Sequence, residues 1–208
     1  QRHEKALDSS SLRHLLHERL AHFQLSPTHI NDFTDVMYCG PRAFFLRTIL
    51  RFPTAPKPEV QFGNAMHETL EWLHIIVRKD GLLPSTQALE KAYEKRLSDK
   101  RMSKRYYTHY LERGLAALQA YVAQRAQTIA ADNIVEYNFR NEGVFIGKAH
   151  LTGKIDKMIV DRKQKTITII DYKTGRKSYT TWKREAKLHK YKLQLYIYRA
   201  LIEGSHTY

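Results

Sequence analysis

One stretch of the chain decides its fold, and it reads Gly153-Lys-Ile-Asp-Lys-Met-Ile-Val-Asp-Arg-Lys-Gln-Lys-Thr-Ile-Thr-Ile-Ile-Asp-Tyr-Lys-Thr-Gly175. It holds two runs rich in β-branched residues, 155–160 and 166–170, and a polar loop at 162–165 lies between them. Two such runs on either side of a short polar loop are typical of a β-hairpin. The sequence therefore predicts an antiparallel hairpin at this point of the chain.

The register of this hairpin brings acidic residues together. If Asp161 pairs with Thr166 across the loop, the same register places Asp156 opposite Asp171. Directly opposed residues have Cβ atoms roughly 4.5–5.5 Å apart, and two carboxylates held that close repel each other unless a cation lies between them. Lys173 follows two residues after Asp171, and the period of a strand points both side chains to one face. This patch is either a divalent-metal site with a lysine beside it or a group of solvated surface charges.

Length and composition bound the class of protein. The chain has 208 residues, of which 42% are hydrophobic and 27% are charged, and these values suit a folded domain with a core. The formal net charge of +14 attracts polyanions, with nucleic acid as the first candidate and an anionic membrane surface as the alternative. No apolar run approaches about 18 residues and no signal peptide is present, so we expect a cytoplasmic, nucleoid-associated protein without a membrane partner.

Hydrophobic periodicity and the proline and glycine breaks predict the remaining elements. The strongest helix, 61–79, carries Met66, Leu70 and Leu73 on one face, with His67 beside that face. Further helices are predicted at 10–23, 26–38, 42–50, 84–97, 106–131 and 185–203, and further strands at 134–139 and 144–148. The fold class is therefore α/β, with a helical N-terminal portion followed by a small sheet and one last helix.

The chemistry of the hairpin residues favours a metal site. Asp156 and Asp171 are candidate ligands for Mg²⁺ or Mn²⁺, because hard divalent ions prefer carboxylate oxygen. Such an ion polarises a phosphoryl oxygen and activates water, while Lys173 would orient that water or stabilise charge on the phosphate. The side chain of Tyr172 should lie in the core, but its backbone carbonyl could reach the metal. Glu136 is either a third acidic group at this site or an exposed strand residue.

Two other candidates have a structural alternative. A lone helical histidine such as His67 is more often a core residue than a ligand, although neutral imidazole suits manganese or iron better than magnesium. Gln194 and Tyr198 lie one turn apart on the last helix. They either pack in the core or contact a nucleotide or the catalytic lysine.

A run of positive charge follows the hairpin. From Lys173 to Lys192 there are eight Lys or Arg residues and one acid, with Tyr179 and Trp182 among them. Such a run is often only a solvated face, but its place after the candidate metal site and its aromatic residues favour binding of a nucleic-acid strand. We call it the basic segment, and its candidate DNA-binding residues are Arg176, Lys177, Lys183, Arg184, Lys187 and Lys190.

Taken in order, the motifs of this chain resemble the RecB-like nucleases of the PD-(D/E)XK superfamily. Each motif is short, but their order along the chain is the signal. They are Ser26-Pro-Thr-His-Ile-Asn-Asp-Phe, Cys39-Gly-Pro-Arg-Ala-Phe-Phe, Gly63-Asn-Ala-Met-His67-Glu, Glu136, Gly153-Lys-Ile-Asp156, Asp171-Tyr-Lys173-Thr-Gly and Gln194-Leu-Tyr-Ile-Tyr198.

The resemblance implies a fold and a set of roles. The fold would be restriction-endonuclease-like, with a central mixed sheet flanked by helices. Residues 1–25 would be a linker and N-terminal helix, and residues 26–208 a nuclease domain without its closing strand. The metal ligands would be His67, Asp156 and Asp171, and Lys173 would be catalytic. Gln194 and Tyr198 would support the site or bind DNA.

The resemblance also implies an activity and partners. The activity would be metal-dependent hydrolysis of phosphodiester bonds in DNA, by an exonuclease or endonuclease acting on single strands or duplex ends. The partner would be the helicase portion of a superfamily 1 repair polypeptide, which fits a chain that begins at Gln1. AddB-type relatives hold an iron–sulfur cluster with four cysteines. Cys39 is the only cysteine here, so no such cluster is expected within this chain.

Two alternatives to an active nuclease stay open. One is a catalytically silent DNA-binding module of the same fold. A decayed site would be expected to lose Asp171 or Lys173 first, and both are present. The other is a structural or partner-docking domain, which would not bind DNA or would bind it without dependence on salt.

Overall fold

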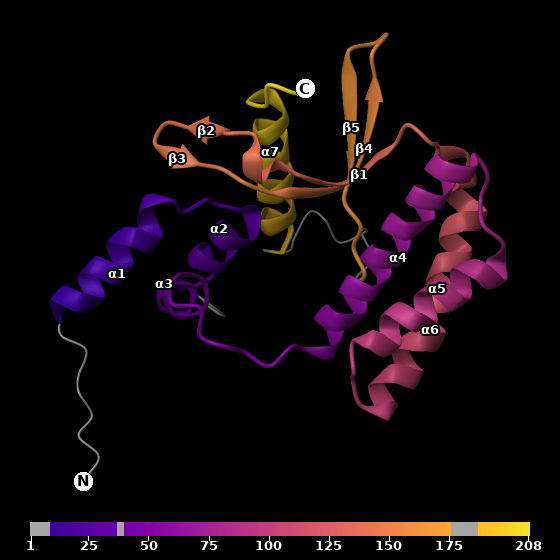
Figure 1. Cartoon of the computed structure of the whole chain (residues 1–208), viewed down its shortest axis with the longest axis horizontal. Coiled ribbons are helices and arrows are strands. Elements are labelled where there is room, and N and C mark those ends of the chain that lie inside the picture. Colours follow the sequence, from indigo (N-terminus) through magenta and orange to yellow (C-terminus); the bar gives the residue numbers. More distant parts are fainter. Residues whose placement is uncertain (1–8, 37–39, 176–186) are drawn as a thin grey trace. The chain divides into compact units, whose positions relative to one another are not determined.

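The computed structural model describes residues 9–36, 40–175 and 187–208, and the chain divides into two compact units (Figure 1). The sheet unit comprises residues 55–137 and 154–179, and the terminal unit comprises residues 1–54, 138–153 and 180–208. Helices combined with a small antiparallel sheet confirm the predicted α/β class.

The sheet unit is built on the predicted hairpin. Its three strands, β1 (Ile134–Asn138), β4 (Lys154–Asp161) and β5 (Thr166–Ile170), lie in the order β1-β4-β5. β4 and β5 are antiparallel, and Asp161 pairs with Thr166, which confirms the predicted register. One carboxylate oxygen of Asp161 accepts the backbone N–H groups of Lys163 and Gln164, both at 2.9 Å, and this closes the turn.

Three helices supply the core of the sheet unit: α4 (Pro58–Asp80), α5 (Thr86–Asp99) and α6 (Lys104–Arg125). Proline at the first turn of α4 and Gly81 at its C-terminal cap, with a φ of +73°, set the ends of that helix. The predicted apolar face of α4 is confirmed. Its residues share one buried cluster with residues of α5 and α6, including Phe62, Met66, Leu70, Leu73, Val77, Tyr93, Leu97 and Leu118.

Close packing between α5 and α6 requires a glycine. The side chain of Tyr93 is fully buried, and its hydroxyl donates a hydrogen bond of 2.7 Å to the carbonyl of Tyr110. A Cβ placed on Gly114 would lie 2.1 Å from the hydroxyl oxygen of Tyr93. The absence of a side chain at 114 therefore makes room for the tyrosine.

The terminal unit joins short elements from distant parts of the chain. Ser26 caps a helix at its N-terminus by accepting the backbone N–H of His29, and proline follows at the first helical position, as predicted. Its elements are α1 (Ser9–Ala21), α2 (Pro27–Thr34), α3 (Gly40–Phe44), a π-helical turn (Phe45–Ile49), β2 (Phe145–Ile146), β3 (Ala149–His150) and α7 (Lys187–Glu203).

Most predicted element bounds shift by one to three residues, and the helix expected at 42–50 is α3 followed by the π-helical turn. Three further differences are larger. The strand expected at 144–148 is a two-stranded hairpin, because Gly147 has a φ of +57° and reverses the chain. The helix expected at 26–38 ends at Thr34. The helix expected at 106–131 begins at Lys104 and ends at Arg125, followed by a 3₁₀ turn. No described helix has both the length and the apolarity to cross a membrane.

Lys157 and His74 are two of the titratable side chains buried in the sheet unit. Lys157 is fully buried, and its ammonium group donates a hydrogen bond of 2.6 Å to the carbonyl of Thr128. His74 on α4 is 1% exposed, and neither of its ring nitrogens has a hydrogen-bond partner among the described residues. Burial, and then the charges of Lys157 and Arg78, lower the pKa of His74 to about 4.

The buried His74 should make stability depend on pH. Its folded pKa of about 4 lies below the ordinary value of 6.5, so the unfolded chain binds more protons between these values. Stability is therefore lost as the pH falls from about 6.5 towards 4. From pH 7.5 to pH 5, urea unfolding of the wild type should lose about 2 kcal/mol more than that of His74→Leu. His14→Leu, on exposed α1, is the control, and equal losses in wild type and His74→Leu would contradict a neutral buried imidazole.

Gly114→Ala should destabilise the fold although alanine is the better helix former. Relative to glycine, alanine normally stabilises a helix interior by about 1 kcal/mol. Here the added Cβ would displace Tyr93, and overpacking of this kind costs about 1–3 kcal/mol. Urea unfolding measures the difference, and Ala116→Gly on the exposed face of α6 gives the propensity term alone. A stabilised Gly114→Ala variant would show that Tyr93 does not fill this space.

Candidate metal centre

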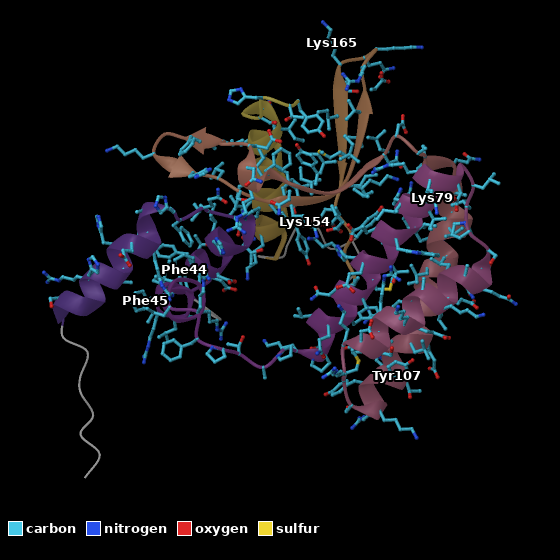
Figure 2. The ribbon with its side chains drawn as sticks, in the orientation of Figure 1. Phe44, Phe45, Lys79, Tyr107, Lys154 and Lys165 are labelled. Carbon is cyan, nitrogen blue, oxygen red and sulfur yellow. The ribbon has the colours of Figure 1, made fainter. Side chains whose placement is uncertain are left out.

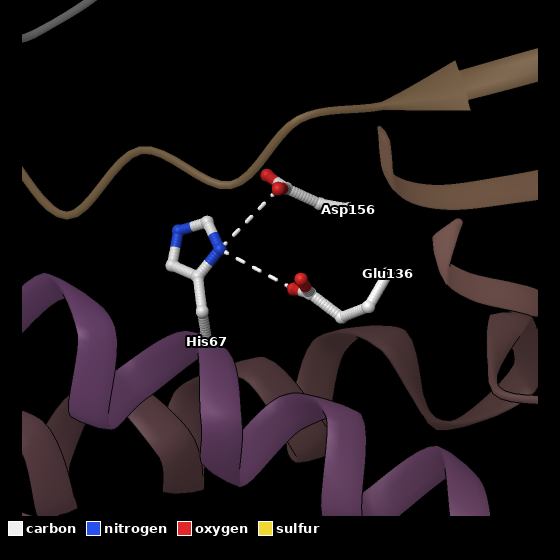
Figure 3. Close-up of side chains that lie close together, drawn as sticks. All are labelled: His67, Glu136 and Asp156. Carbon is white, nitrogen blue, oxygen red and sulfur yellow. Dashed lines mark ion pairs between the residues drawn. The ribbon is translucent and has the colours of Figure 1, made fainter. Parts of the chain in front are cut away.

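Three side chains from three elements of the sheet unit meet at one point (Figure 3). They are His67 on α4, Glu136 on β1 and Asp156 on β4, and their candidate ligand atoms all lie within 4.8 Å of one another. Nδ1 of His67 is 3.3 Å from a carboxylate oxygen of Asp156 and 3.6 Å from one of Glu136. One nitrogen and two carboxylates in this arrangement could hold a divalent cation.

The imidazole of His67 is oriented by the backbone. Its Nε2 lies 3.2 Å from the carbonyl oxygen of Tyr172, and because a carbonyl only accepts, Nε2 carries a proton and donates it. Nδ1 is thereby directed to the two acids, as in metal-ligating histidines whose other nitrogen donates to a carbonyl. Burial lowers the pKa of His67, but the carboxylates of Asp156 and Glu136 outweigh it and raise the pKa to about 10. The site therefore holds a proton where a cation could bind.

Asp156 is held from two sides. One carboxylate oxygen accepts the backbone N–H of Tyr172 at 2.6 Å, and the other faces His67. The alternation of β4 explains this placement, because the next residue, Lys157, points to the opposite side and into the core. The strand thus directs one acid to the site and fixes its rotamer by a charge-assisted hydrogen bond.

Glu136 reaches the site through an unusual backbone conformation. Its φ is +52°, in the left-handed region, although it lies within β1 and is not a glycine. That conformation costs about 1–2 kcal/mol for an L-residue, and such departures cluster at functional sites, where they re-aim side chains. Burial opposes ionisation, but hydrogen bonds to His67 and Lys154 lower the pKa of Glu136. The carboxylate is therefore charged.

The three ligand candidates line a cavity of about 540 Å³. The same cavity is lined by Glu59, Glu68 and Glu71, so five carboxylates surround it, against the side chains of Lys154 and His67. Lys154 forms an ion pair with Glu136. A phosphate group would be repelled from so acidic a cavity unless a cation were bound there. The electrostatics therefore favour a cation site.

Asp171 and Lys173 follow directly after β5. Their side chains form an ion pair of 2.5 Å. Burial raises the pKa of Asp171, and the charge of Lys173 partly opposes this. The antiparallel pairing ends at Lys157 and Ile170, one residue before the predicted opposition of Asp156 and Asp171. Among the described residues Asp171 is not part of the three-residue group, and its role as a ligand stays a prediction.

Tyr172 faces the core, as its position in the alternation suggested. Its hydroxyl lies 2.9 Å from that of Tyr121, and its ring meets the imidazole of His67 edge-on with centroids 6.0 Å apart. Its carbonyl oxygen is the acceptor for His67 Nε2. Direct ligation of a metal by this carbonyl stays a prediction.

The candidate DNA-binding residues belong mostly to the terminal unit or lie outside the described residues. Nε2 of Gln194 donates a hydrogen bond of 2.6 Å to the hydroxyl of Tyr198 on α7. Lys190 forms an ion pair with Asp35. Lys187 begins α7. Arg176, Lys177, Lys183 and Arg184 lie outside the described residues.

Lys154 is a site residue that the sequence reasoning missed. It lies two residues before Asp156 on β4, so the period-two argument that linked Lys173 to Asp171 would have found it. The left-handed backbone of Glu136 has no comparable signal, because glutamate does not favour a positive φ.

The chain matches one known protein family. The family model of the PD-(D/E)XK nuclease superfamily matches residues 24–207, a range that includes the hairpin and all three members of the ligand group. No curated protein and no solved structure matches the chain. Because the family match covers most of its length, the chain belongs to the PD-(D/E)XK nuclease superfamily.

Proposed function

We propose that this chain is a divalent-metal-dependent deoxyribonuclease that hydrolyses phosphodiester bonds. Members of its superfamily are generally metal-dependent nucleases. The observation that carries the proposal is the convergence of His67, Glu136 and Asp156 in an acidic cavity. The +14 net charge of the chain supports a polyanionic substrate, and DNA is the substrate we propose.

The residues present fit a divalent cation. An imidazole nitrogen with two carboxylates suits Mn²⁺, and carboxylates with water suit Mg²⁺. Nδ1 of His67 is the atom directed at the carboxylates, and Nε2 donates to the carbonyl of Tyr172. When a cation binds, the imidazole therefore loses the proton on Nδ1 and keeps the one on Nε2. When bound, the cation supplies a Lewis acid for a phosphoryl oxygen and lowers the pKa of water.

The protein's own groups would position the reaction. The N–H and C=O of Tyr172 orient Asp156 and His67. Asp171 holds the ammonium group of Lys173 by an ion pair. That ammonium would orient the attacking water or stabilise negative charge that develops on the phosphate. The folded chain thus holds charged groups in fixed positions around the place where the phosphate would react.

The finer assignment to RecB-like nucleases is also part of the proposal. The order of the histidine motif, the hairpin acids and Gln194 with Tyr198 supports it. It brings with it a superfamily 1 helicase as the partner portion of the polypeptide and a role in DNA repair. The catalytically silent DNA-binding module is the alternative, and cleavage assays separate the two.

Mn²⁺ should stabilise the wild-type fold through His67. A ligand that binds only the folded state at about 100 times its Kd adds about 2.7 kcal/mol to the free energy of unfolding. His67→Ala removes the only nitrogen of the ligand group, so most of this gain should be lost. Urea unfolding with Mn²⁺ and with EDTA measures it without any need for activity. His14→Ala is the control, and an equal Mn²⁺ gain in wild type and His67→Ala would contradict the site.

Asp171→Ala and Lys173→Ala should each abolish cleavage while DNA binding is largely retained. Asp171 holds the ammonium group of Lys173 next to the ligand group, where its positive charge would act on the phosphate during cleavage. DNA binding depends mainly on other phosphate contacts. The assay uses end-labelled single- and double-stranded DNA with Mg²⁺ or Mn²⁺. Lys165→Ala, at the tip of the hairpin (Figure 2), is the control and should cut normally. If either variant cut at the wild-type rate, this assignment of roles would be wrong.

A further inference from the structure

A second pocket of the sheet unit lies beside the acidic cavity. Its volume is about 420 Å³, and it shares Glu59 and Thr174 with that cavity. Thr174 follows directly after Lys173, and its hydroxyl oxygen would be 3.3 Å from a Cβ on Gly63 of α4. The two pockets are therefore neighbours, and the segment that follows the hairpin lines both of them.

The wall of this pocket is a stack of aromatic rings. Tyr110 lies nearly parallel to Phe62, with ring centroids 4.6 Å apart and an angle of 16° between the planes. Tyr106 continues the stack, with its centroid 6.4 Å from that of Tyr110 and an angle of 15°. These separations are those of stacked rings with a lateral offset.

A cation closes the inner end of the stack. The guanidinium carbon of Arg113 lies 4.9 Å from the centroid of Phe62, within the range of a cation–π contact. The same guanidinium donates a hydrogen bond to the carbonyl of Thr174. Arg113 thus connects the aromatic stack, whose rings come from α4 and α6, to the segment that carries Lys173.

The rings of the stack differ sharply in exposure. Phe62 and Tyr110 are 3% and 5% exposed, whereas Tyr106 is 44% exposed. Core packing accounts for the two inner rings. It does not account for the outermost ring, which extends the stack to the surface and lines an open pocket.

We propose that Tyr106 is the platform of a subsite that stacks one unpaired nucleobase of the substrate strand. The proposal rests on the proposed function for the identity of that strand. Every base has a π-face, so stacking on an aromatic platform tolerates any sequence. Lys104 and Arg105 are exposed and directly precede Tyr106, and they supply positive charge for the backbone phosphates.

The charged groups of the pocket are already engaged, which suits a neutral base better than a phosphate. The guanidinium of Arg113 lies over the ring of Phe62 and donates to the carbonyl of Thr174. Glu59 is the acidic residue of the pocket and is engaged with the hydroxyl of Tyr110; burial and then this acid raise the pKa of Tyr110. A phosphate would meet the carboxylate, whereas an uncharged ring meets the aromatic face. A base held here would fix the strand beside the acidic cavity, and positioning of this kind lowers the entropic cost of reaction.

The test measures DNA binding in EDTA at low salt, where hydrolysis does not interfere. Fluorescence anisotropy gives the affinity of the whole chain for a labelled single-stranded oligonucleotide and for the same backbone with abasic sites. The wild type should bind the base-bearing strand more tightly. Tyr106→Ala should lose roughly 5- to 140-fold in affinity for the base-bearing strand, the range of one base–aromatic stack, and little for the abasic one. Tyr106→Phe keeps the ring and should keep the preference.

Phe145→Ala is the matched control, because Phe145 is also an exposed aromatic residue, 58% exposed, stacked on His150 in the terminal unit. If Tyr106→Ala still preferred the base-bearing strand over the abasic strand as strongly as the wild type does, the subsite would be overturned. An equal loss of affinity for both strands would also overturn it. Cleavage by the wild type with Mn²⁺ is scored separately. Base-dependent binding without cleavage would support the subsite and refute the nuclease, whereas cleavage with no effect of Tyr106→Ala would do the reverse.

Discussion

The site depends on the carboxylate of Asp156, which joins three elements of the sheet unit. One oxygen accepts the N–H of Tyr172 after β5, and the other faces His67 on α4. The carbonyl of Tyr172 in turn orients His67. Asp156, Tyr172 and His67 therefore form a closed ring of contacts. Tyr172 orients both of the other residues, and His67 faces Asp156. Because each member fixes the next, the ligand atoms of His67 and Asp156 are positioned before any cation arrives, which is the arrangement expected of a preorganised site.

Two features of this site are unfavourable for the stability of the folded chain. Glu136 lies in the left-handed region within β1, and five carboxylates line one cavity. In the absence of a divalent ion, the proton of His67 and the ammonium group of Lys154 balance part of this charge. A bound cation would neutralise the carboxylates more completely. Catalytic sites commonly sacrifice stability in this way, and the large buried cluster of α4, α5 and α6 supplies the stability that the sheet unit needs.

Local sequence signals predicted much of the fold. The β-branched runs around 162–165 gave the correct hairpin register, and the helical spacing of apolar residues gave the buried face of α4. His67 and Asp156 are candidate site residues from the sequence, and their side chains lie together in the structure. The sequence did not predict the backbone of Glu136, because a positive φ at glutamate arises from tertiary contacts rather than from local propensity. The Tyr106 stack was hidden for a similar reason, since the helical spacing of 106, 110 and 113 is also that of an ordinary core face.

The central claim is that a divalent cation binds between His67, Glu136 and Asp156. The most direct measurement is anomalous X-ray diffraction from crystals of the chain that contain Mn²⁺. We expect an anomalous peak at coordination distance, about 2.0–2.2 Å, from Nδ1 of His67 and from oxygens of both acids. A peak held only by other carboxylates, or an ordered site with Nδ1 still turned to the acids and no peak, would contradict it.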